Sequence, residues 1–471
     1  MEIKIRPITI PSDSPFTNDA LSREDEISNL TELLVNIETP FVLAIDSKWG
    51  TGKTTFIKMW EAELTNRNIS TLYFNAWKTD FAEDPLVAFL GELNSTISTL
   101  INEESGKIEI WEKTKKLGGH IAKRGIPVAI KIATAGVVDT DALLEKEISS
   151  LSQKLAEEAV DSFNKTKGII EEFRNNLEIL FRNNSDSETN KTFIFIDELD
   201  RCRPTYALEL LEKVKHILDV KNLVFILSID KSQLCNSIKS VYGNEIDAVN
   251  YLRRFIDIEY SLKEADRESY INTVYRKFDF ESFFESRKEY SDFSYEKDSF
   301  LKLFKLMTNC FRLSLREIEQ YLTKIYLVIL STKQNIHLYS PILVALIFLK
   351  ETNSNLYKEY KYLPKGGDST ILYFRSLLSD EERIKIHQFA LLEGFLIASK
   401  ANRYEEPSSL ILEEHNKTLA NEDSTSYERS YAKKVINTAK EPIDWRSGIV
   451  LEDIIKRVEM AEQFNLSDKN S

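Results

Sequence analysis

Cysteine and histidine are scarce in this chain. Cys202, Cys235 and Cys310 are the three cysteines among 471 residues, and no two of them form a CxxC pair. The five histidines show no ligand spacing either. This usage is typical of a reducing compartment and gives no framework for a structural metal site.

Positive charge is also in deficit. The chain has 62 Lys and Arg residues against 75 Asp and Glu residues, which gives a formal net charge of −13. A broadly cationic protein that coats nucleic acid or an anionic membrane is therefore disfavoured, although the composition still allows a local basic groove.

No run of apolar residues reaches the roughly 20 that a membrane span needs. The segment 117–138 is interrupted by Lys123, Arg124 and Lys131, and the 15-residue run 335–349 ends at Lys350. The N-terminal sequence MEIKIRPITIPSDS mixes charges and prolines, unlike an export signal. We therefore expect no transmembrane span and a cytoplasmic protein, with both segments packed inside the protein or lying on its surface.

Apolar residues are nevertheless plentiful enough to build a large core. They make up 42% of the chain, with 26 Phe and 19 Tyr, which excludes a disordered or fibrous protein. The length suggests roughly three compact units. Short strand-like runs alternate with helical patterns and predict a parallel α/β sheet; they occupy residues 41–46, 70–77, 191–197, 222–230 and 255–262.

Helical patterns fill most of the remaining chain. A short leading helix is expected after Ser22 as its N-cap, and a predominantly helical insertion runs over about residues 95–185. From about residue 264 onward, apolar-periodic segments between polar breaks predict an all-helical remainder.

A phosphate-binding loop follows the first predicted strand. The sequence SKWGTGKTT fits GxxxxGK[ST] except that Ser47 stands at the first glycine position. Gly50 and Gly52 allow backbone N–H groups to approach phosphates, Lys53 reaches the β and γ oxygens, and Thr54 offers a hydroxyl to Mg²⁺. A fortuitous turn is the alternative, but the strand before it and the helix after it favour a nucleotide loop made by Lys48, Trp49, Gly50, Thr51, Gly52, Lys53, Thr54 and Thr55.

An acidic strand end supplies the other half of a hydrolytic site. FIFIDELDR places Asp197 and Glu198 directly after a fully apolar strand, at the sheet edge where α/β folds bind ligands. We assign Asp197 to Mg²⁺ and Glu198 to the attacking water. Asp200 and Arg201 are expected to pair with each other or with a neighbouring subunit. An ordinary acidic loop is the alternative, which the phosphate loop upstream makes less favourable.

Five motifs follow one another along roughly residues 15–330: SKWGTGKTT, LYFNAW, FIFIDELDRCRPTYALELLEKVKHIL, VFILSIDKSQL and YLRRFIDIEY. Together they resemble the KAP family of P-loop NTPases. The resemblance implies an α/β P-loop ATPase core of AAA+/STAND-like layout, with an additional central strand and a catalytic glutamate. Many relatives carry transmembrane helices between the phosphate loop and the acidic strand, where this chain is too charged to span. Some bacterial members look like phage-exclusion or antiviral-defence proteins.

The resemblance also suggests secondary site residues. Ser228 and Asp230 occupy the place of a γ-phosphate sensor, or else serve as ordinary caps. Arg253 and Arg254 stand where related folds project an arginine finger, with a solvated helix cap as the alternative. Arg316 is similar to a second sensor arginine, or else forms a surface ion pair with Glu317 or Glu319. Arg23 is a nucleotide-contact candidate. Trp49 and Trp77 are expected to pack beside the loop.

We therefore expect an ATP- and Mg²⁺-dependent NTPase that works as a conformational switch. Its predicted parts are a core over 1–262, a helical lid over 263–335 and a helical domain of unknown role over 336–471. The expected partners are ATP and either further copies of the chain or an effector protein. Two alternatives remain open, a nucleotide-gated scaffold with little turnover and a nucleic-acid-stimulated motor, the latter disfavoured by the net charge.

Overall fold

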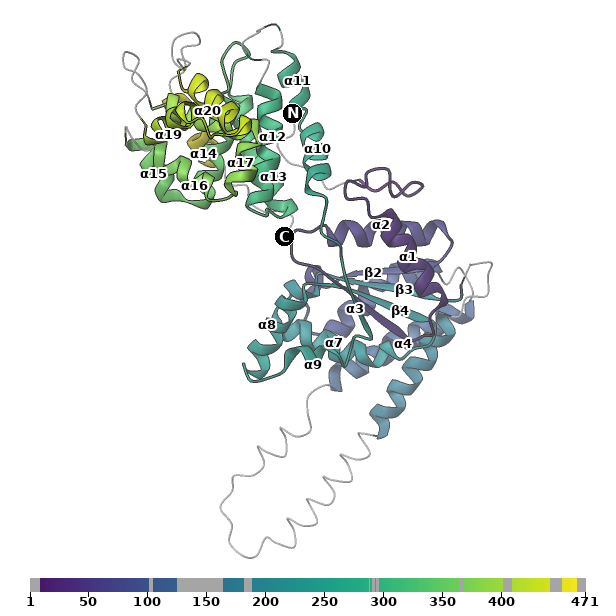
Figure 1. Ribbon diagram of the computed structural model, residues 1–471. Coiled ribbons are helices and arrows are strands. Elements are labelled where there is room, and N and C mark those ends of the chain that lie inside the picture. Colours follow the sequence, from purple (N-terminus) through teal and green to yellow (C-terminus); the bar gives the residue numbers. More distant parts are fainter. Residues whose placement is uncertain are drawn as a thin grey trace, which may run out of the picture. The chain divides into compact units, whose positions relative to one another are not determined.

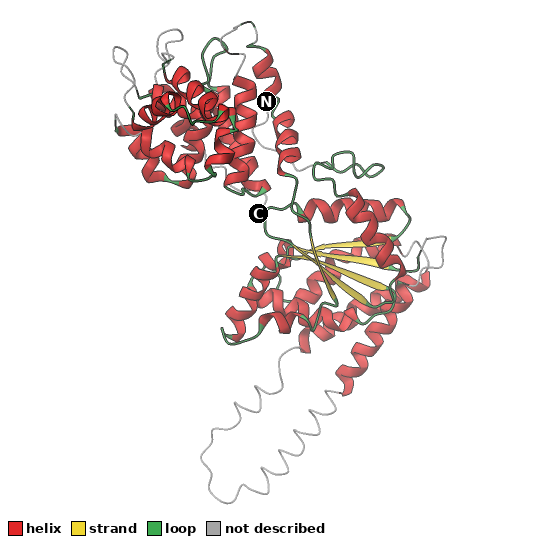
Figure 2. Ribbon diagram, viewed as in Figure 1, coloured by secondary structure: helices red, strands yellow, loops and turns green. Residues whose placement is uncertain are grey.

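The computed structural model describes residues 9–100, 105–124, 164–181, 189–287, 289, 293, 296–363, 367–400, 409–440 and 451–463. The chain divides into two units, the first ending at Glu264 and the second beginning at Ala265. The first unit contains the sheet (Figures 1 and 2). The described part of the second unit consists of helices, which pack against one another to form the core of that unit.

Five parallel strands form the sheet of the first unit, in the order β2-β3-β4-β1-β5. Their bounds are β1 Phe41–Asp46, β2 Ser70–Asn75, β3 Thr192–Asp197, β4 Leu223–Ile229 and β5 Ile258–Ser261. Every residue of β3 and β4 is buried, as their unbroken apolar runs predict. Because β4 lies between β1 and β3, the expected α/β P-loop fold with an additional central strand is confirmed.

Helices cover both faces of this sheet, and alternate strand residues serve alternate faces. Phe193 and Phe195 pack with α1 (Glu24–Asn36) and α2 (Lys53–Asn66), and Trp60 of α2 donates a 2.8 Å hydrogen bond to Thr31 of α1. Ile194 and Ile196 face the opposite core. That core is closed by α3 (Pro85–Leu100), α4 (Ser105–Arg124), a helix over 164–180, α7 (Pro204–Leu218), α8 (Lys231–Tyr242) and α9 (Ala248–Leu252).

The cap of the leading helix differs from the prediction. The helix begins at Glu24, and Ser22 has a positive φ of 54° and does not cap it. The Asp19 carboxylate instead accepts the backbone N–H groups of Arg23 and, at 3.1 Å, Glu24. The Ser22 prediction was wrong because a carboxylate four residues upstream of Arg23 folds back to the backbone amides where the helix begins.

The insertion between β2 and β3 is helical in its described parts. Helices α3, α4 and 164–180 occupy it. Of the first apolar segment, residues 117–124 lie in α4 and the remainder lies outside the described residues. None of the helices described by the structure combines the length and the hydropathy that a membrane crossing requires.

The second unit is built from helices. Its described helices are α10 Arg267–Lys277, α11 Phe280–Glu285, α12 Glu296–Cys310, α13 Leu315–Leu330, α14 Ser340–Thr352, α15 Ser354–Tyr362, α16 Gly367–Arg375, α17 Asp380–Ile384, α18 His387–Ala398, α19 Leu410–Ala420, α20 Ser426–Ala439 and α21 Leu451–Gln463. Residues 340–349 of α14 are all buried. The second apolar segment is therefore a core helix, one of the two placements expected for it.

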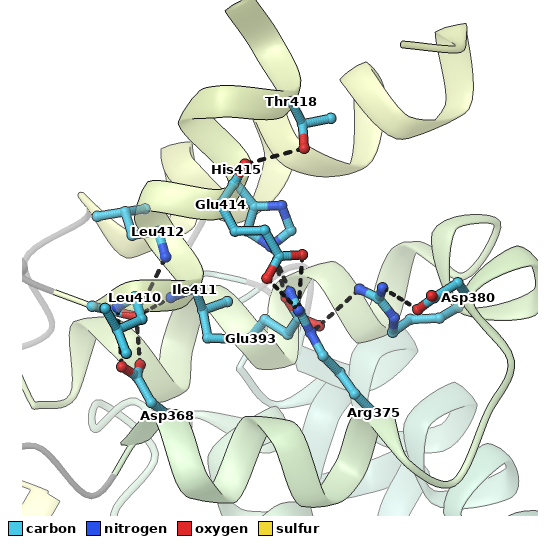
Figure 3. Close-up of polar contacts among 12 residues, drawn as sticks. Asp368, Arg375, Asp380, Glu393, Leu410, Ile411, Leu412, Glu414, His415 and Thr418 are labelled. Atoms are coloured by element: carbon cyan, nitrogen blue, oxygen red, sulfur yellow. Dashed lines mark hydrogen bonds and ion pairs between the residues drawn. The ribbon is translucent and has the colours of Figure 1, made fainter. Parts of the chain in front are cut away.

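A buried ionic cluster joins several helices of the second unit (Figure 3). Glu393 of α18 is 1% exposed, and its carboxylate accepts hydrogen bonds from Nε and Nη2 of Arg375 at 2.7 and 2.8 Å. His415 Nε2 lies 2.9 Å from Glu393 Oε2, and Arg383 Nη1 lies 3.4 Å from Oε1. Burial alone would raise the pKa of Glu393, but the hydrogen bonds from Arg375 and His415 outweigh it and lower that pKa to about 2.

Candidate functional site

The carboxyl ends of the parallel strands bring the predicted site residues to one edge of the sheet. In the strand register, Asn75 of β2 is beside Asp197 of β3, which is beside Ser228 of β4, which is beside Ile45 of β1. Neighbouring strands lie about 4.8 Å apart. The loop that follows β1 and the acidic residues that follow β3 are therefore separated by the width of one strand.

The phosphate loop joins β1 to the N-terminus of α2. Gly50 and Gly52 have φ of 76° and 89°, in the left-handed region that favours glycine, and Gly52 is the N-cap of α2. Ser47 does not have a positive φ, so serine is tolerated at the first glycine position. Its hydroxyl donates to Thr51 Oγ1 at 2.8 Å, and Thr51 Oγ1 donates to Lys48 O at 2.8 Å. The loop thus has the turn and the helix N-terminus that bind phosphates.

Lys53 opens α2 with its ammonium group turned back over the loop. Nζ donates to the carbonyl oxygens of Ser47 and, at 3.2 Å, Lys48. Burial lowers the pKa of Lys53, while the carboxylates of Asp200, Asp230 and Asp197 oppose that change. The ammonium therefore lies in the field of the acidic residues at the strand ends, as one site would require. Of the other loop residues, Thr54 is exposed and Thr55 half-buried in the first turn of α2.

Asp197 is held at the end of β3 by two donors. It is 1% exposed, its Oδ2 accepts the Tyr73 hydroxyl at 3.1 Å, and its Oδ1 accepts the backbone N–H of Glu198 at 2.9 Å. Burial and the charge of Asp197 raise the pKa of Tyr73, so the phenol stays protonated and donates. The orientation of the predicted magnesium carboxylate is thus fixed by protein groups.

Glu198 is occupied on both carboxylate oxygens. Asn75 Nδ2 donates to Oε2 at 2.8 Å, and Arg201 Nη1 lies 3.0 Å from Oε1. The residue has a φ of 61°, which turns the chain sharply after β3. Arg201 pairs with Glu198 rather than with Asp200, so the expected Asp200–Arg201 pair is not formed.

Asp200 instead contacts the phosphate loop. Its Oδ2 accepts the indole N–H of Trp49. Trp49 is 45% exposed, so its expected role as a packing residue was wrong, while Trp77 is half-buried with the Arg201 guanidinium 5.8 Å from its ring. A hydrogen bond between Trp49 and Asp200 directly connects the two motifs.

The same edge offers an unused polar group. Ser228 is 1% exposed, and its Oγ has no hydrogen-bond partner among the described residues. Asp230 serves as the N-cap of α8 and accepts the N–H groups of Ser232 and Gln233. A buried hydroxyl without a partner, next to Asp197, fits a site that takes a polar ligand.

Oxygen donors at this edge suit a hard cation. Across the described part of the chain, no cluster of three or more His, Cys, Asp or Glu residues could hold a metal ion. Mg²⁺ does not need such a cluster, because in nucleotide sites it takes one or two protein oxygens and otherwise phosphates and water. Asp197 with Thr54 is the predicted donor set, and their role as Mg²⁺ ligands stays a prediction.

The arginine candidates lie in different surroundings. Arg253 and Arg254 are exposed after α9; Arg253 Nη1 donates to Asn250 Oδ1 at 3.0 Å, and the Arg254 guanidinium is 5.6 Å from the Tyr251 ring. Arg23 is 2% exposed, and its guanidinium binds Glu26 at 2.7 Å and Lys263 O at 2.8 Å.

Arg316 is half-buried in the first turn of α13, in the second unit. The two acids proposed as its alternative partners have other contacts: Glu317 completes the capping box with Ser314, and Glu319 accepts the Tyr270 hydroxyl. The functional roles of all four arginines stay predictions.

Two residues of β2, Tyr73 and Asn75, belong to the site although the sequence motifs did not single them out. Both lie in the LYFNAW segment, which the pattern identified as a strand. The available signal was the pair of polar side chains near the end of an otherwise apolar strand, since parallel strands end at a common edge.

Comparison with known proteins identifies a family. The family model described as the KAP family P-loop domain matches residues 23–335. No curated protein matches the chain.

Proposed function

The chain belongs to the KAP family of P-loop domains, and from this premise we propose that it binds ATP with Mg²⁺ and hydrolyses the γ-phosphate bond. The observation that carries the proposal is the hydrogen bond from Trp49 to Asp200, which joins the phosphate loop to the acidic strand end. A phosphate loop alone would support nucleotide binding, whereas hydrolysis also needs carboxylates beside it.

Each group at the edge has a distinct task in this proposal. The N–H groups at the start of α2 and the Lys53 ammonium bind the β and γ phosphate oxygens. Thr54 and Asp197 hold Mg²⁺, which when bound neutralises negative charge on those oxygens. Glu198 orients the attacking water and accepts its proton, and the Ser228 hydroxyl donates to the γ-phosphate.

Release of ADP at saturating ATP tests hydrolysis. We expect ADP release by the wild-type chain and its loss in Glu198→Gln, which keeps the size of the side chain and one of its two hydrogen-bond acceptors but cannot accept the proton. Glu198→Gln should still bind ATP. Equal ADP release by both chains would contradict the assignment of Glu198.

A nucleotide-gated scaffold is the second candidate function. It is favoured by the hydrogen bonds that Asn75 and Arg201 make to Glu198, because a carboxylate engaged in this way is a poor base. The molecular mass in solution, with and without ATP and Mg²⁺, separates the two. A scaffold assembles with ATP in wild type and Glu198→Gln alike, while an obligate hydrolase loses its activity in Glu198→Gln.

A nucleotide-driven switch in antiviral defence is the most specific form of the proposal. It is supported by membership of the KAP family, some bacterial members of which look like phage-exclusion proteins, and the hydrolysis of the γ-phosphate would reset the switch. Plating of phage on cells that express the wild-type chain or Lys53→Ala tests it. Protection by the wild-type chain alone would support the proposal, and equal plating on both would contradict it.

A further inference from the structure

The hydrogen bond between Trp49 and Asp200 has an unusual setting. It connects residues that are 151 positions apart in sequence. Asp200 is 5% exposed and therefore fixed by its surroundings, whereas Trp49 is 45% exposed. Packing contacts constrain only the buried part of the Trp49 indole. The position of the ring is therefore determined mainly by its hydrogen bond to the buried Asp200 carboxylate.

The loop that carries Trp49 needs such a constraint. Gly50 and Gly52 both take left-handed conformations, and glycine loses more backbone freedom on ordering than any other residue. The side-chain hydrogen bonds of Ser47 and Thr51 stay within the loop. The bond from Trp49 reaches outside it, to the residues after β3, and so limits where the whole loop can move.

Asp200 also acts on the phosphate-binding lysine. Among the carboxylates that counter the effect of burial on Lys53, that of Asp200 contributes most. The same side chain therefore accepts a hydrogen bond from the loop and provides negative charge near its ammonium group.

We propose that Trp49 and Asp200 are a pair of positioning residues that hold the phosphate loop in its phosphate-accepting form before nucleotide arrives. The inference rests on the proposed function for its effect on ATP, but its effect on the free loop does not. Neither residue needs to take part in the chemical step. Loop order gained in advance strengthens the binding of substrate and transition state alike, so its loss should raise KM more than it lowers kcat.

The test compares Trp49→Phe with the matched control Trp111→Phe. Both keep an aromatic ring and lose an indole hydrogen bond, since Trp111 Nε1 donates to Asn94 Oδ1 at 2.8 Å in the helical insertion. Hydrogen exchange of the amides of residues 47–53 is measured without nucleotide. Titration with ATP and Mg²⁺ then gives the affinity.

We expect faster exchange of the loop amides in Trp49→Phe and an ATP affinity weaker by about tenfold or more, the size typical for one charge-assisted hydrogen bond. Trp111→Phe should match the wild type in both measurements. Loop exchange in Trp49→Phe equal to that of the wild type would overturn the proposal.

A double-mutant cycle shows whether the effect depends on the pair. In the Asp200→Ala background, Trp49→Phe should have no further effect on loop exchange, and an undiminished effect would overturn the proposal. If Asp200→Ala does not fold, Asp200→Leu, which also lacks an acceptor but fills the buried space, takes its place. If the wild-type chain does not bind ATP, the proposed function is refuted. The hydrogen-exchange measurements, which are made without nucleotide, still test whether Trp49 and Asp200 order the loop.

Discussion

The side-chain amide of Asn75 donates a 2.8 Å hydrogen bond to Oε2 of Glu198. With Arg201 at the other oxygen, this contact keeps the predicted catalytic base engaged by protein groups. The two residues come from adjacent parallel strands, so the contact is set by the register of β2 against β3. A base held in this way must be released before it can act on water.

Asn75→Ala should therefore raise basal ATP turnover. Loss of one hydrogen bond to a charged group corresponds to roughly 1.5 kcal/mol or more, so a rise of about tenfold or more is expected. Steady-state ADP release without any partner measures it. A fall in turnover would contradict the prediction and would mean that Asn75 orients Glu198 for catalysis.

Lys53→Ala should reduce ATP affinity by about a hundredfold or more, because it removes the ammonium group beside the phosphates. Calorimetric titration with ATP and Mg²⁺ measures the loss. Lys113→Ala is the control, since this lysine side chain is 59% exposed on α4 and pairs with Glu172. Unchanged ATP affinity in Lys53→Ala would refute the assignment of the loop.

Asp197→Asn should weaken Mg²⁺-dependent turnover more than nucleotide binding. The amide keeps one acceptor oxygen for the Tyr73 hydroxyl but lacks the negative charge that a hard cation prefers. Turnover as a function of Mg²⁺ concentration should give a half-saturation point about tenfold higher. A purely structural role would lower stability without shifting that concentration.

Glu393→Gln tests the buried ionic cluster through its pH dependence. The pKa of Glu393 is lowered to about 2 from an ordinary value of 4.5, so its stabilising contribution is present above pH 4.5 and is lost as the pH falls toward 2. The full contribution corresponds to about 3 kcal/mol. Urea unfolding measures the free energy of unfolding between pH 7 and pH 2. We expect this free energy to fall with pH in the wild type and to fall by less in Glu393→Gln.

The control for that experiment is Glu414→Gln. Glu414 also binds Arg375, at 2.9 Å, but its side chain is 53% exposed. An exposed ion pair contributes about 1 kcal/mol or less, so this variant should keep both the stability and the acid dependence of the wild type. Equal losses in the two variants would contradict the special role of the buried carboxylate.

The strands were predictable because their residues leave few alternatives. FVLAID and TFIFID are apolar runs too short for a helix, and they form β1 and β3 as expected. The expected strand 255–262 is shorter, as β5 covers Ile258–Ser261. The Asp257 carboxylate accepts a 2.8 Å hydrogen bond from the backbone N–H of Val42. A side-chain oxygen thus replaces the backbone carbonyl that would accept this N–H if the strand began earlier.

The site was only partly predictable, since a motif names residues but not their neighbours across the sheet. The phosphate loop and Asp197 follow from their spacing along the chain. The contacts of Tyr73 with Asp197 and of Asn75 with Glu198 depend on strand register, which the residues of β2 alone do not reveal. The hydrogen bond from Trp49 to Asp200 was not predicted, because the aromatic bulk of tryptophan suggested a packing role. In the structure the indole N–H donates to Asp200 and so positions the ring.

The burial of α14 has a consequence for how the second half of the chain folds. Helices α12 and α13, from before residue 336, and α18 and α21, from after it, all pack against α14. A cut at that point would leave either fragment with a wide apolar face in water, and such faces aggregate. The described helices on both sides of residue 336 therefore share one apolar core, and we expect the predicted lid and the helices after it to unfold together instead of as detachable parts.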